Sequence, residues 1–145
     1  MSAKAKPTVD LSMTQVMADL HVAEFCIDRA EGTAPKIAKP FKGQAGYHLQ
    51  QASEKLIKIQ MYNSGKTLNY SKLYKHNLDD LILYAQSLGI TLSVPSYVRQ
   101  HAYTISSWEA RGRYDLHLVV RIDVLKKSYN EILSWYNDLK NQGFQ

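Results

Sequence analysis

The sequence lacks the features that would fix a chain by covalent bonds or anchor it in a membrane. It has one cysteine, Cys26, which excludes an internal disulfide and a cysteine-rich metal site. Cys26 falls on the apolar side of a predicted helix, so we expect a buried, unreactive thiol. No window approaches the ~20 apolar residues of a membrane-spanning helix, and the basic start of the chain precedes no apolar signal core. We therefore expect a cytoplasmic protein with no membrane association.

Signals for metals, phosphate loops and strands are also missing. No two histidines stand three or four residues apart with a carboxylate, so we expect no metal site and no cofactor. The stretch at residues 63–67 ends like a phosphate-binding loop, with Gly65, Lys66 and Thr67, but it lacks the earlier glycine and the preceding strand. No segment alternates apolar and polar residues at period two for long, which argues against a sheet.

What the sequence does contain is helical periodicity over most of its 145 residues. Ser12 and Gln15 form a capping box at the start of a helix to about Ala30. Asn77 is placed as the N-cap of a helix to about Leu88, and the last helix carries apolar residues from Leu118 to Leu139 at spacings of four and three. The expected fold is all-α, an up-and-down bundle of four to five helices.

Two connecting segments complete this prediction. Residues 31–43 contain Gly32, Pro35, Pro40 and Gly43, so we expect a loop there, followed by a helix over about 44–63. Pro95 fits the first turn of a fourth helix that continues past Glu109 to a break near Gly112. With 45% hydrophobic residues, the chain is expected to form a tail at 1–10 and a single domain over 11–142.

Three short motifs resemble the HEPN family (higher eukaryotes and prokaryotes nucleotide-binding), and together they cover roughly residues 10–140. The first two lie on the predicted helices over 44–63 and 77–88: Tyr47, His48, Gln51, Ala52, Glu54 and Lys55, then His76, Asn77, Leu78 and Leu81. The third runs from Glu109 to Asp115 and looks like the family's Ala-Arg-Tyr segment, interrupted by Gly112 and Arg113. The resemblance implies a HEPN-like helical domain.

The resemblance also implies a candidate ribonuclease site. Many HEPN proteins are metal-independent ribonucleases with an arginine followed by a histidine after four to six residues, and here Arg111 and His117 have five between them. An imidazole can move protons to and from the ribose 2′-hydroxyl and the leaving oxygen, while a guanidinium can hold the phosphate. In this family two protomers usually join their motifs in a homodimer cleft, where we place Arg113 as a third catalytic candidate and Tyr114 as a binding residue.

A structural role for the same residues remains open. Gly112 follows Arg111 where the active family members usually have a polar residue, and Arg113 lies only three residues before His117. Arg113 can instead pair with Asp115 or Glu109, and His117 can be an ordinary residue at a helix start.

The net charge of +5 suits a polyanionic partner such as RNA or a nucleotide. Lys36, Lys39 and Lys42 recur every three residues, and we include them with His76 among the candidate binding residues. A solvated surface would explain the lysines equally, and packing at the start of a helix would explain His76. Ten tyrosines stand against three phenylalanines. Those outside the core, Tyr70, Tyr74, Tyr97 and Tyr103, can stack on bases or line a dimer interface.

Two functions are therefore expected from different classes. The first is a homodimeric HEPN-fold protein that binds RNA and cleaves it by 2′-hydroxyl attack, as a ribonuclease of the toxin or defence type. The alternative is a non-catalytic HEPN module that binds nucleotides or partners a small nucleotidyltransferase.

Overall fold

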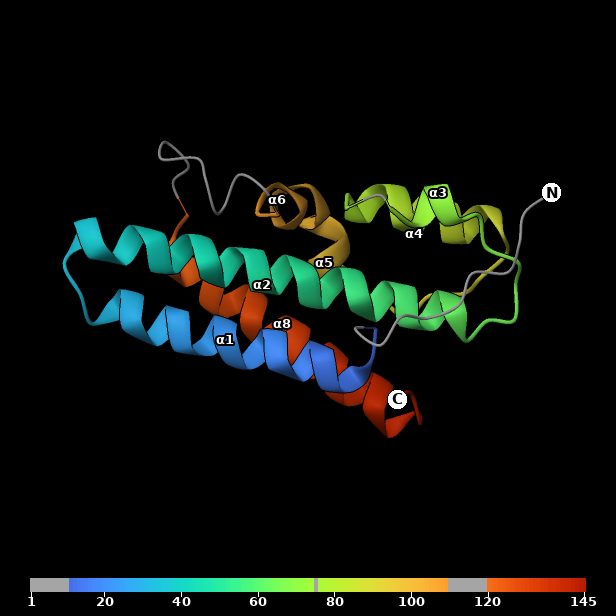
Figure 1. Ribbon diagram of the computed structural model, residues 1–145, viewed down its shortest axis with the longest axis horizontal. Helices are drawn as coiled ribbons and strands as arrows, with labels where there is room; N and C mark the ends of the chain where they lie inside the picture. The colour runs from blue at the N-terminus through green and yellow to red at the C-terminus, as the bar shows by residue number, and fades with distance from the viewer. Residues whose placement is uncertain (1–10, 75, 110–119) are drawn as a thin grey trace.

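The computed structural model describes residues 11–74, 76–109 and 120–145 (Figure 1). These ranges contain helices, turns and loops but no strand, which confirms the all-α prediction. Three helices are long: α1 (Met13–Glu31), α2 (Pro35–Tyr62) and α8 (Ile122–Asn141). Four are short: α3 (Tyr70–Leu73), α4 (Leu78–Ser87), α5 (Ser96–Gln100) and α6 (Ala102–Ser107). No described helix has the length and apolar character needed to cross a membrane.

Helices α1 and α2 lie side by side and antiparallel along their length, and α8 packs against both (Figure 1). The short helices α3, α4 and α6 lie along the opposite side of α2 from α1, while α5 packs against α6 and α8. One hydrophobic core joins these layers and includes residues from every long helix, among them Leu20, Leu49, Leu56, Leu125 and Trp135. Helix α2 is thus central and contributes polar side chains to surfaces on both of its flanks.

Two helix starts lie where the sequence predicts them. The Ser12 hydroxyl accepts a hydrogen bond from the Gln15 backbone N–H at 3.2 Å, at the start of α1. The Asn77 side chain accepts one from the Asp80 N–H, also at 3.2 Å, at the start of α4. Such caps satisfy N–H groups that have no partner within the helix, which is why these boundaries can be predicted locally.

The predicted loop over residues 31–43 is wrong, because α2 already begins at Pro35 and only residues 32–34 connect it to α1. Pro35 lies in the first turn, where a missing N–H costs nothing, since that N–H would have no partner in the helix. Pro40 loses only the bond to the Lys36 carbonyl, on an exposed part of the helix. Packing against α1 therefore outweighs the local preference of these residues to interrupt a helix.

The predicted fourth helix is also divided, into α5 and α6 at His101. The backbone of His101 departs from helical geometry, with φ −109° and ψ 15°. Its ring stacks on Tyr97 with 4.1 Å between centroids, and its Nδ1 donates to the Tyr97 carbonyl at 2.8 Å. Pro95 is the N-cap of α5, one residue before its first turn.

The extended segment before α5 is held by a side chain of α2. The Gln60 amide accepts from the Ser93 N–H at 2.7 Å and donates to the Ser93 carbonyl at 3.0 Å. Trp135 of α8 donates its indole N–H to the same carbonyl at 2.7 Å. Gln60 therefore takes the place of a neighbouring strand for a segment that has none in the described fold.

Helix α2 passes very close to the Trp108 indole at Gly46. A Cβ on Gly46 would lie 2.9 Å from Cγ of Trp108, whose side chain is 3% exposed. Alanine favours a helix over glycine by up to ~1 kcal/mol, but overpacking a filled core costs ~1–3 kcal/mol. We expect Gly46→Ala to lower the free energy of unfolding in urea by about 1 kcal/mol, whereas Gln44→Ala, exposed on the same helix, should change it by less than ~0.5 kcal/mol. A stabilised Gly46→Ala protein would contradict this contact.

Candidate functional site

Four predicted site residues, Arg111, Arg113, Tyr114 and His117, lie outside the residues that the structure describes. Their arrangement therefore stays a prediction from the sequence. Glu109, at the edge of that segment, is half-buried just beyond α6.

The structure places Lys36, Lys39 and Lys42 on the first two turns of α2 rather than in a loop. At ~100° per residue, a spacing of three spreads them over about a third of the helix circumference. None of them forms an ion pair with the carboxylates of the described ranges. Lys42, the nearest of the three, lies about 18 Å along the helix axis from Glu54, where the next group of charges begins. Their predicted binding role is not part of the site described below.

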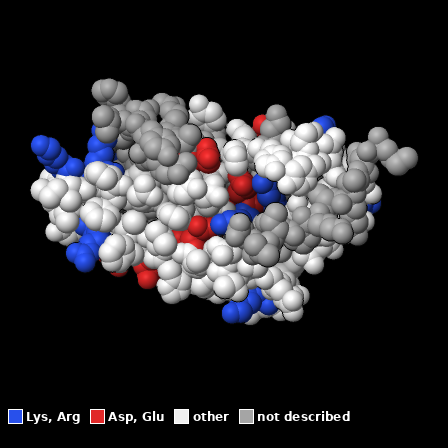
Figure 2. All heavy atoms as spheres, viewed as in Figure 1, with Lys and Arg blue, Asp and Glu red and all other residues white. Residues whose placement is uncertain are grey.

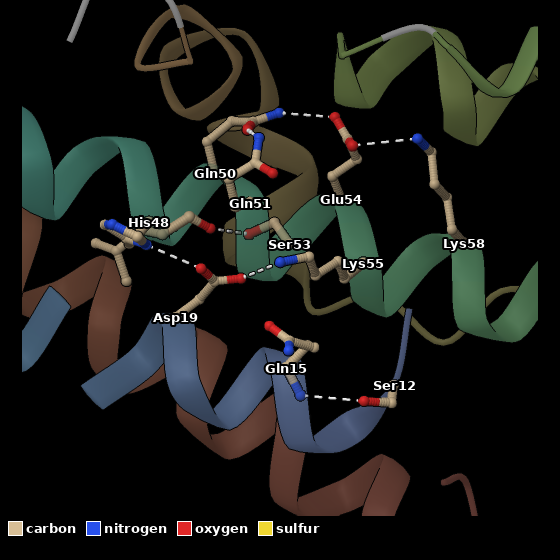
Figure 3. Close-up of polar contacts among 11 residues, drawn as sticks. Ser12, Gln15, Asp19, His48, Gln50, Gln51, Ser53, Glu54, Lys55 and Lys58 are labelled. Atoms are coloured by element: carbon tan, nitrogen blue, oxygen red, sulfur yellow. Dashed lines mark hydrogen bonds and ion pairs between the residues drawn. The ribbon is translucent and has the colours of Figure 1, made fainter. Parts of the chain in front are cut away.

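Asp19 of α1 is the centre of a first charged cluster, formed with two side chains of α2 (Figure 3). Its Oδ2 lies 2.6 Å from Lys55 Nζ, and its Oδ1 lies 2.8 Å from His48 Nδ1. Because a carboxylate only accepts, His48 carries its proton on Nδ1. The side chains of Asp19 and Lys55 are 10% and 17% exposed, so this pair is mostly removed from water.

Glu54 forms a second cluster on the neighbouring face of α2. Its carboxylate accepts from Lys58 Nζ at 3.1 Å, from His76 Nδ1 at 2.8 Å and from Gln50 Nε2 at 3.2 Å. Gln50 also donates to the His76 carbonyl at 2.8 Å. His76, which precedes the N-cap of α4, is thus held through both its backbone and its ring. The Glu54 side chain is only 7% exposed, whereas that of His76 is 50% exposed. The His76 ring is therefore held in a fixed tautomer, with Nε2 left as the nitrogen for a ligand.

Some residues of these clusters line a surface pocket of about 260 Å³ between α2 and α3, which we call the tyrosine pocket. Its polar lining comprises Glu54, Lys55, Lys58 and His76, and the rest comprises Leu11, Tyr62, Tyr70, Leu73 and Tyr74. Acidic and basic side chains lie side by side in the middle of this face of the molecule (Figure 2). The pocket thus joins ammonium groups, one imidazole and several aromatic rings.

Two tyrosines of the pocket, Tyr62 and Tyr74, have raised pKa values. Tyr74 donates its hydroxyl to that of Tyr70 at 2.8 Å, and this bond raises the pKa of Tyr74 above its usual value near 10. Burial, followed by the proximity of Tyr70, raises the pKa of Tyr62. The Tyr70 and Tyr74 rings meet edge to face with 4.8 Å between centroids, and the two side chains are half or more exposed. They offer exposed aromatic surface beside the pocket.

Among the described residues, the structure brings the predicted binding residue His76 into the tyrosine pocket together with Tyr70 and Tyr74, which the sequence offered for base stacking or a dimer interface. Lys55 and Lys58 were missed as ligand groups, although Glu54, Lys58 and Tyr62 recur every four residues and so share one side of α2. The described residues contain no group of three or more potential metal ligands. Cys26 is buried as expected, and burial raises its pKa.

No protein family, curated protein or solved structure matches this chain.

Proposed function

We propose that this chain is a HEPN-like cytoplasmic protein that binds RNA or free nucleotides, with the tyrosine pocket as its nucleotide-binding site. The observation that carries the proposal is the convergence of Lys55, Lys58 and His76 with three tyrosines around one pocket. A nucleotide combines a phosphate with a flat base, and the pocket offers a partner for each.

The phosphate would bind at the polar side of the pocket. An ammonium group has three N–H donors, and Lys58 uses one on Glu54 while Lys55 uses one on Asp19. Each lysine therefore keeps donors for a phosphate, and Nε2 of His76 becomes a third donor when the ring is protonated. Glu54 and Asp19 hold these cations in place but also offset their charge, so we expect micromolar rather than nanomolar affinity for a single nucleotide.

The base would stack on the exposed ring of Tyr74 and meet the Tyr70 ring at an angle, because the planes of the two rings lie 82° apart. Stacking of a base on an aromatic side chain contributes ~1–3 kcal/mol and tolerates any base. Leu73 and Tyr62 extend the apolar side of the pocket beneath them. This arrangement predicts binding of nucleotides with little preference for sequence.

Tyr74→Ala is expected to weaken binding of uridine monophosphate by about 5- to 150-fold, because it removes ~1–3 kcal/mol of stacking. Tyr74 is 61% exposed, so its loss should leave the fold intact. Tyr74→Phe is the matched control, since it keeps the ring and loses only the hydroxyl bond to Tyr70; it should bind nearly as wild type. Isothermal titration calorimetry with the three proteins makes the test. Equal affinity of Tyr74→Ala and wild type would exclude the tyrosine pocket as the site.

The second function that we propose is RNA cleavage at a homodimer cleft by Arg111 and His117, with Arg113 nearby. It is supported by the spacing of five residues between Arg111 and His117, which the HEPN resemblance associates with ribonucleases. The 2′-hydroxyl would attack the adjacent phosphorus, and the 5′-oxygen would leave with a proton, giving a 2′,3′-cyclic phosphate and a 5′-hydroxyl. The deciding measurement is the chemistry of product ends after incubation of RNA with the protein in EDTA.

A further inference from the structure

A second pocket shares His76 with the tyrosine pocket. It has a volume of about 250 Å³ and is lined by His76, Asn77, Tyr103, Ser106, Ser107 and Glu109. His76 lines both pockets, so the two hollows lie next to each other at this residue. Neither the sequence motifs nor the function proposed above assigns a role to this second pocket.

The His76 ring is fixed in place. His76 is held through its Nδ1 by the buried Glu54 carboxylate and through its carbonyl by Gln50. Next to it, the Leu78 N–H donates to the Ser106 hydroxyl at 2.8 Å, which joins the start of α4 to α6 and so fixes the two walls of the second pocket. A ligand that entered both pockets would therefore meet preformed walls, at little cost in ordering the protein.

The second pocket has the chemistry of a base site rather than a phosphate site. Tyr103 is 74% exposed, the most exposed of the large hydrophobic side chains in the described ranges. The Glu109 carboxylate would repel a phosphate but can accept from N–H and O–H groups. The described lining contains no lysine or arginine, whereas Lys55 and Lys58 line the tyrosine pocket.

From this juxtaposition we infer that the two pockets bind consecutive nucleotides of a single strand. One base stacks at Tyr70 and Tyr74, the next stacks on Tyr103, and the intervening phosphate lies beside His76 and the lysines. The preferred ligand is thus a single-stranded oligonucleotide of at least two nucleotides. This inference rests on the proposed nucleotide binding at the tyrosine pocket, and it adds the second position and the length of the ligand.

Calorimetric titration of the full chain with deoxyuridine ligands tests the inference, because strands without 2′-hydroxyls are not substrates for the proposed cleavage. The ligands are deoxyuridine 5′-monophosphate, the 5′-phosphorylated dinucleotide, and the same dinucleotide with an abasic first sugar, so that the remaining base keeps a 5′-phosphate as in the monophosphate. We expect the dinucleotide to bind about 5- to 150-fold more tightly than the abasic form, which has the same charge, because one stacked base contributes ~1–3 kcal/mol. Tyr103→Ala should remove this difference and leave affinity for the monophosphate unchanged.

The other outcomes separate the inference from the proposed function. Binding of the monophosphate with equal affinities for the dinucleotide and its abasic form would overturn the second position alone. A difference in affinity between the dinucleotide and its abasic form that persists in Tyr103→Ala would also overturn it, since the base outside the tyrosine pocket would then stack elsewhere. Absence of binding by all three ligands to folded wild-type protein would overturn both the inference and nucleotide binding at the tyrosine pocket.

Discussion

Asp19→Ala is expected to lower the free energy of unfolding by about 1.5–3 kcal/mol, because it removes a charge-assisted hydrogen bond from a mostly buried ammonium group that still reaches the tyrosine pocket. The Lys55 ammonium lies 2.6 Å from Asp19, and both side chains are less than a fifth exposed. His48 loses its acceptor in the same change. Since domains of this size are stable by ~5–15 kcal/mol, the loss is a large share of the total. Urea unfolding followed by helical circular dichroism measures it.

Two further variants test whether the loss of stability comes from the burial of Asp19 and Lys55. Glu31→Ala removes another carboxylate of α1 that lies 3.0 Å from a lysine, Lys126, but this pair is 40–51% exposed and should cost less than ~1 kcal/mol. In a Lys55→Met background, Asp19→Ala should cost much less than it does alone, because no buried ammonium group then remains unpaired. Similar losses for Asp19→Ala and Glu31→Ala would show that water screens the inner pair as effectively as the outer one.

Helix boundaries with a local cause were predictable from the sequence. Ser12 and Asn77 cap α1 and α4 through bonds to N–H groups three residues away, so the sequence contains both partners side by side. The start of α2 has no such local cause. Pro35, Pro40 and Gly43 disfavour a helix on their own, and their helical state depends on the antiparallel α1, which a reading of local preference does not include.

The polar clusters were beyond such a reading because their partners are distant in the chain. Asp19 and Lys55 are separated by 36 residues, and Glu54 and His76 by 22. Two of the HEPN-like motifs did contain Glu54, Lys55 and His76, but as separate segments. Only the packing of α3 and the start of α4 beside α2 shows that they surround one pocket. The residues with predicted ribonuclease chemistry, in contrast, lie in a segment that the structure does not describe.

His117→Ala is expected to slow RNA cleavage by at least ~10²-fold, because loss of a group that moves protons in the transition state typically costs 10²–10⁴-fold. Wild-type protein in EDTA should yield ends with 2′,3′-cyclic phosphate from a structured RNA and leave the matching DNA intact. His21→Ala is the matched control, since His21 is an exposed histidine of α1 with no predicted role in the reaction. Size-exclusion chromatography should show that both variants keep the oligomeric state of the wild type.

Arginine variants then distinguish the two ways of pairing this histidine. If Arg111 holds the phosphate, the single variant Arg111→Ala should lose activity as His117→Ala does, while Arg113→Ala should retain most of it. Loss of activity in Arg113→Ala and its retention in Arg111→Ala would assign the phosphate to Arg113. Cleavage that continues in His117→Ala would contradict the mechanism. No cleavage by wild-type protein, together with nucleotide binding in the tyrosine pocket, would favour the non-catalytic module, and co-purification with a small nucleotidyltransferase would then be the expected result.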